Sequence, residues 1–145
     1  MSDRLIKVAD IPNGLWQSKE GLLSLPVDLC RLYREQLELK GLLTVALSAT
    51  LDEGPVGGMS LEDTKKHFAT RFSGSCARVQ LAVLDPKDDL QNASDLFLKT
   101  FSGGKVGLLD IPCGAGAASA SLLTCVAALR EQSVLPREPL YVWLL

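Results

Sequence analysis

The residues best suited to chemistry lie in one short stretch, 106–116, where an apolar run meets a carboxylate and a glycine-containing turn. Asp110 is the only acid between Val106 and Arg130, and an ionised carboxylate at the end of an apolar strand is costly unless it is solvated or paired. Gly114 and Gly116 follow, and glycine lets the backbone come close to a ligand. We therefore expect Asp110 to face a crevice filled by water or by a small ligand.

Three elements must position these residues. The spacing predicts a short strand at 106–110, a helix from about Ala117 to Arg130, and a second strand at 140–145. A strand, helix and strand in this order form a βαβ unit with parallel strands. Ligands bind at the carboxyl ends of such strands, beside the helix N-terminus with its unpaired N–H groups and partial positive charge.

The chain ahead of this unit has the pattern of helices. Apolar residues recur at helical spacing from Val27 after Pro26, and the pattern can be followed to Leu47. Ser60 and Asp63 resemble a capping box that opens a second helix, which we expect Ser73-Gly74 to break. Segment 75–84 fits both strand and helix, and we favour helix. Asp85-Pro86 is expected to open a last helix that ends at Gly103-Gly104.

Composition excludes several classes of protein. The net charge is −2 and aromatic residues are 6%, which argues against a basic nucleic-acid module and against a base-stacking surface. Four scattered cysteines and one histidine do not have the spacing of a zinc site. No secretory signal opens the chain, so we expect free thiols and a cytoplasmic protein. The uncharged run 111–129 is interpreted as a buried helix with its entry loop, not as a membrane span.

The stretch Asp110-Ile111-Pro112-Cys113-Gly114-Ala115-Gly116 resembles motif I of the class I S-adenosylmethionine-dependent methyltransferases, with Pro112 in place of the first glycine of that motif. The flanking pattern agrees over about 40 residues, from Lys105 to Leu145. The resemblance implies an α/β fold: a helical leader or cap region at 1–104 and an incomplete Rossmann-like βαβ unit at 105–145. It also implies S-adenosylmethionine as cofactor, held by Asp110, Pro112, Cys113, Gly114, Ala115, Gly116 and Ala117.

Two other interpretations of the turn stay open. A dinucleotide fingerprint needs GxGxxG directly after the strand, and Gly114 and Gly116 fit it while Ser119 stands at the third glycine. The turn could also join strand and helix without any ligand, since short glycine motifs recur by chance. A phosphate-binding P-loop and a GxSxG nucleophile elbow are both absent from the sequence.

The resemblance covers only half of a cofactor site. In the family, the acid that holds the cofactor ribose and the motif that binds the acceptor come later than residue 145. We therefore expect the chain by itself to be inactive, as the N-terminal portion of a methyltransferase-like protein, and we assign it no catalytic residue and no metal site. The alternative is a non-catalytic binding or assembly subunit whose sheet is completed by a protein partner or a second copy. Nucleic acid enters only as a methyl acceptor of a complete enzyme.

Overall fold

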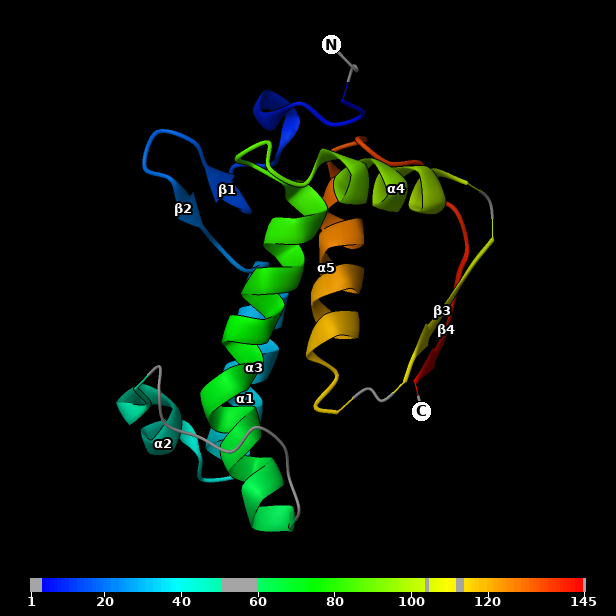
Figure 1. Ribbon diagram of the computed structural model, residues 1–145. Helices are drawn as coiled ribbons and strands as arrows, with labels where there is room; N and C mark the ends of the chain where they lie inside the picture. Colours follow the sequence, from blue (N-terminus) through cyan, green and yellow to red (C-terminus); the bar gives the residue numbers. More distant parts are fainter. Residues whose placement is uncertain (1–3, 51–59, 104, 112–113, 145) are drawn as a thin grey trace.

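The protein is a mostly helical α/β structure in the computed structural model, which describes residues 4–50, 60–103, 105–111 and 114–144 (Figure 1). These residues form five α-helices and two small two-stranded sheets. The elements are a 3-10 turn at Val8–Asp10, β1 (Trp16–Gln17), β2 (Leu22–Leu23), α1 (Val27–Leu39), α2 (Leu43–Ser48), α3 (Leu61–Leu84), α4 (Gln91–Ser102), β3 (Val106–Asp110), α5 (Ala117–Glu131) and β4 (Leu140–Leu144).

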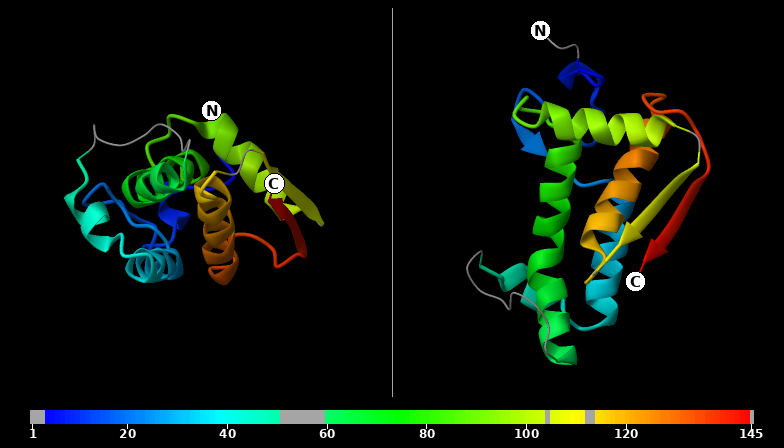
Figure 2. Two further views of the ribbon diagram at one scale, coloured as in Figure 1. Left: turned by 90° about the horizontal axis from the view of Figure 1, so that it is seen from below. Right: turned by 45° about the vertical axis from the view of Figure 1, so that its right-hand side comes forward.

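The predicted strand, helix and strand at the C-terminal side are confirmed. β3 and β4 pair in parallel, with Val106 opposite Leu140 and Asp110 opposite Leu144, and α5 joins them. Figure 2 shows the two strands running beside α5, on the side of that helix away from α3. β1 and β2 form a separate antiparallel pair near the N-terminus.

The core lies where α3, α4 and α5 meet. α3 and α5 run side by side and α4 crosses their upper ends in Figure 1. Leu84 and Leu129 are fully buried there, together with Cys125. Burial of side chains of this size stabilises the fold by about 1.5–3 kcal/mol each. Val106 of β3 is buried in the same core and packs the strand against these helices.

A second, smaller core joins α1 and α3 near the start of α5. Leu29, Phe72 and Cys76 are buried in it. The ring of Tyr33 stacks on Phe72 with centroids 4.9 Å apart, and its hydroxyl donates to the carbonyl of Ala69 at 2.8 Å. Ala115, Ala117 and Ala120, at the turn and the start of α5, pack against this cluster.

The N-terminal arm is packed onto the main core. Trp16 is buried in the main core. Arg4 reaches the junction of α3 and α4, where its guanidinium lies 3.3 Å from the carboxylate of Asp85 and 3.1 Å from that of Asp88. Two strands of two residues each give no alternation to detect, so the sequence showed only weak signals here.

The predicted break at Ser73-Gly74 is wrong, because α3 continues through both residues to Leu84. A glycine inside a helix costs about 1 kcal/mol relative to alanine. Burial of Phe72 and Cys76 on either side of Gly74 outweighs that cost. Segment 75–84 is helical, as favoured, and Ser60 caps α3 by accepting from the amide of Asp63.

Two helix ends also differ from the prediction. The first helix ends at Leu39, and Gly41, with φ of +66°, separates it from α2. Asp85 is not an N-cap; it ends α3 in the left-handed region, and α4 begins only at Gln91. The Asp85 carboxylate still accepts from the amides of Asp89 and Leu90 and so shapes the connection. The predicted end of this helix is confirmed, because α4 ends at Ser102 with Gly103 as its C-cap, in an extended conformation; Gly104 lies outside the described residues.

No helix in the described ranges is both long and apolar enough to cross a bilayer. The uncharged run instead supplies α5, whose Val126 and Leu129 are buried, as the sequence predicts.

Candidate functional site

Asp110 is the last residue of β3, at the carboxyl end of the parallel pair, and its side chain is half-buried. Alternation along the strand places it on the same face as Val106 and Leu108, the face toward α5. The sequence prediction of a carboxylate at a strand end beside a helix N-terminus is therefore confirmed in its placement.

The carboxylate of Asp110 has a protein partner that the sequence analysis did not identify. The hydroxyl of Ser119 donates to its Oδ2 at 2.6 Å, and Ser119 itself is buried. Ser119 lies in the first turn of α5, so this bond ties the strand end to the start of the helix across the intervening turn. In the sequence, Ser119 appeared only as a departure from a third glycine.

The turn depends on two glycines in the left-handed region of backbone conformation. Gly114 has φ of +53° and Gly116 has φ of +72°, values that side-chain-bearing residues rarely adopt. A Cβ added at either position would meet no atom within 4 Å among the described residues. The side of these two glycines on which a Cβ would stand therefore borders open space, where a small molecule can approach.

Gly116 is also the N-cap of α5 and has no side chain to satisfy the first amides of that helix. The amides at a helix N-terminus carry a partial positive charge and suit an anionic group. The site therefore combines a carboxylate and a helix N-terminus, so it can recognise a small molecule that carries both positive and negative charges.

Ala115 and Ala117 have a different position from the two glycines. Both are half-buried and pack against the smaller core, around Phe72 and Cys76. The thiol of Cys76 donates to the carbonyl of Ala117 at 3.4 Å. These alanines fasten the turn to α1 and α3. The other two predicted site residues, Pro112 and Cys113, lie outside the described residues.

The buried thiols near the site are poor nucleophiles. Burial raises the pKa of Cys76 to about 11 and that of Cys125 to about 12, so both stay protonated at neutral pH. Cys30 is a free and exposed thiol on α1. Within the described ranges, no three His, Cys, Asp or Glu residues are grouped so that they could hold a metal ion.

A separate cleft of about 430 Å³ lies at the other end of α5. It is bordered by the turn at 12–15, the start of α1 and the last two turns of α5, including Thr124 and Glu131. A helix rises 1.5 Å per residue, so about 10 Å of α5 separates Thr124, the first helix residue at this cleft, from the start of the helix at Ala117. Binding at the two places can therefore be distinguished by experiment.

No family model, curated protein or solved structure shows a significant match to the chain.

Proposed function

We propose that β3, the glycine turn and the start of α5 form half of an S-adenosylmethionine site in a methyltransferase-like protein with a Rossmann-like βαβ unit. One observation carries the proposal: two left-handed glycines with open space beside them separate the strand-end carboxylate of Asp110 from the N-terminus of α5. The open space at the Cβ positions of both glycines leaves room for a small ligand beside the turn.

The charges of the site suit the methionine half of this cofactor. S-adenosylmethionine carries a sulfonium and an ammonium group, which an acidic side chain attracts, and a carboxylate, which a helix N-terminus attracts. The acidic side chain is that of Asp110, which is oriented by Ser119. The helix N-terminus is the first turn of α5. The bound cofactor would supply the electrophilic methyl group.

The described residues contribute binding and positioning. Methyl transfer from a sulfonium depends mainly on alignment and on electrostatics, so a site need not offer a covalent nucleophile. The methyl acceptor would be held by groups beyond this half-site, and a nucleic acid is one candidate for it. We expect the chain alone to bind cofactor without turning it over.

A second candidate function is a non-catalytic binding or assembly subunit. It is favoured by the sheet: among the described residues, β3 pairs only with β4, and each strand keeps one unpaired edge. Unpaired edges invite pairing with another strand. A protein partner or a second copy would add strands there and complete the cofactor site.

Calorimetry with S-adenosylmethionine tests the proposal. We expect a dissociation constant in the millimolar range or tighter, weakened at least tenfold by Asp110→Asn. Asp28→Asn, which changes an exposed carboxylate on α1, is the matched control and should leave the affinity unchanged. Binding of a nicotinamide or flavin dinucleotide in place of S-adenosylmethionine would favour the dinucleotide interpretation. Binding of neither, by a chain with native circular dichroism, would overturn the proposed half-site.

A further inference from the structure

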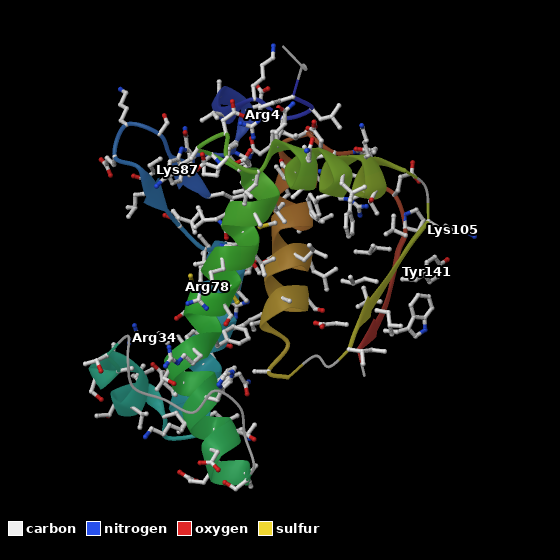
Figure 3. The ribbon with its side chains drawn as sticks, in the orientation of Figure 1. Arg4, Arg34, Arg78, Lys87, Lys105 and Tyr141 are labelled. Atoms are coloured by element: carbon white, nitrogen blue, oxygen red, sulfur yellow. The ribbon has the colours of Figure 1, made fainter. Side chains whose placement is uncertain are left out.

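The face of the β3–β4 sheet that points away from α5 is exposed and apolar. Register places Gly107 beside Tyr141 and Leu109 beside Trp143, and paired residues of a sheet share one face. The exposed fractions of Leu109, Tyr141 and Trp143 are 57%, 48% and 54%. Figure 3 shows Tyr141 and Lys105 on the side of the strands remote from α5. We call this surface, with the exposed Ile111 at its end, the outer sheet face.

The side chains of the outer sheet face are already arranged as a flat surface. The rings of Tyr141 and Trp143 stack with centroids 6.4 Å apart and planes 20° from parallel. The indole of Trp143 lies over Gly107, where an added Cβ would come within 3.1 Å of the ring carbon Cζ3. Glycine weakens a strand interior, and here its missing side chain makes room for the indole to lie across the neighbouring strand.

Size indicates what fits on this face. Its four large apolar side chains are about half exposed. If each has about 200 Å² of surface when fully exposed, the face presents on the order of 400 Å² of apolar surface. A stable interface between two globular partners buries about 800 Å² on each, so this face alone is too small to hold a second copy. Five residues of strand span about 16 Å, which equals about three turns of a single helix.

The positive charge of Lys105 indicates in which direction a helix would lie on this face. Lys105 stands at the start of β3, with its ammonium 6.0 Å from the centre of the Tyr141 ring. A helix on this face would meet that cation at one end, where an acidic residue or the negative C-terminal end of the helix is favoured. Parallel sheets are covered by helices on both faces, and α5 flanks the opposite face.

From these observations we propose that the outer sheet face docks one amphipathic helix of about three turns. Its stripe of leucine or isoleucine lies across Leu109, Tyr141 and Trp143, and its acidic end lies at Lys105. This interaction surface is distinct from the glycine turn and does not require that the turn bind a cofactor.

A pair of synthetic helical peptides tests the proposal on the full chain. The first has 14 residues with leucine at positions 2, 5, 9 and 12 and glutamates near its C-terminus; the second has the same composition in scrambled order. Binding is followed by the indole N–H signal of Trp143 in NMR spectra, assigned with Trp143→Phe. The buried Trp16 is the internal reference. We expect the striped peptide to shift the Trp143 signal with submillimolar affinity.

Two variants with the same chemical change locate the contact. Leu109→Ser on the outer sheet face should lower the affinity for the striped peptide at least tenfold. Leu96→Ser, which changes an exposed leucine on α4, should leave that affinity unchanged. Tyr141→Ser, on β4 and outside the proposed cofactor half-site, should also weaken binding of the striped peptide and should keep its affinity for S-adenosylmethionine, so the two proposals can fail separately. Equal shifts by the scrambled peptide, or no shift by the striped one, would overturn the docking proposal. A dimer by light scattering in which Trp143 is protected without peptide would also overturn it, because the occupant would then be a second copy.

Discussion

The hydroxyl of Ser119 donates to the carboxylate of Asp110 at 2.6 Å and so joins the end of β3 to the first turn of α5. Ser119 comes nine positions after Asp110 in the chain, and the segment between them contains both left-handed glycines. The bond fixes the direction of the carboxylate beside the helix N-terminus. It also makes the serine a positioning residue for whatever the carboxylate binds.

Replacing Ser119 with alanine tests that role. A hydrogen bond to an ionised group contributes about 1.5–3 kcal/mol. Ser119→Ala should therefore lower the free energy of unfolding by roughly 1 kcal/mol or more in urea titrations. It should also weaken the binding of S-adenosylmethionine. Ser121→Ala breaks a different bond of a buried serine, to the carbonyl of Cys76, and is the control for packing. An unchanged cofactor affinity in Ser119→Ala would show that the serine does not position the carboxylate.

The pairing of Arg4 with Asp85 should be a major contribution to stability. Asp85 is 2% exposed, and its partner also donates to the backbone carbonyl of residue 85 at 2.9 Å. Removing one member of a buried ion pair costs up to about 3–5 kcal/mol, and the two amides that donate to Oδ1 of Asp85 offset part of this cost. Arg4→Ala should therefore lower the urea midpoint strongly. Arg34→Ala breaks an exposed pair with Glu38 and should change it little; similar shifts for both would contradict this assignment.

The same substitution should have opposite effects at two glycines. Gly74 lies in α3 with no atom within 4 Å of an added Cβ and no positive φ, so Gly74→Ala should stabilise the protein by about 0.5–1 kcal/mol. Gly116 has φ of +72°, so Gly116→Ala forces a strained backbone and should destabilise it by about 1 kcal/mol or more. Thermal unfolding of the two variants checks the signs, and equal effects would show that the turn can relax.

Alkaline pH should destabilise the fold through Cys125. Burial raises its pKa from the ordinary 9.0 to about 12, so the folded chain keeps a proton that the unfolded chain loses. The stabilising effect is complete below pH 9 and is lost as the pH rises toward 12. The free energy of unfolding should fall by up to about 1.4 kcal/mol per pH unit for this group.

Denaturant titrations at pH 8, 9 and 10 measure that slope. Cys125→Ala should be less sensitive to pH than the parent chain, whereas Cys30→Ala, which removes an exposed thiol, should follow the parent. A Cys125→Ala slope equal to that of the parent would show that this thiol is not responsible.

The sequence predicted the C-terminal unit well because its signals are local. An apolar run at 106–110, a glycine turn and an apolar helix each leave a pattern within a few residues, and the structure has them at β3 and α5. The parallel pairing of β3 with β4 follows from this order of elements. The positions of Asp110, Gly114 and Gly116 were therefore available from the chain alone.

What the sequence did not predict depends on tertiary contacts. α3 continues through Gly74 because burial against α5 outweighs a weak local propensity. The bond from Ser119 to Asp110 joins two residues across the turn, and no residue pattern signals it. The exposure of Trp143 depends on which face of the sheet α5 covers, and a strand of apolar residues on both faces does not show that.

Amide NMR spectra of the chain titrated with S-adenosylmethionine measure the central claim most directly, because glycine amides appear in a sparsely populated region of the spectrum. We predict that the signals of Gly114 and Gly116 shift with increasing cofactor, and that Asp110→Asn suppresses those shifts. Glycine signals that do not move, or shifts confined to the cleft along the second half of α5, around Gly14 and Thr124, would contradict a cofactor site at this turn.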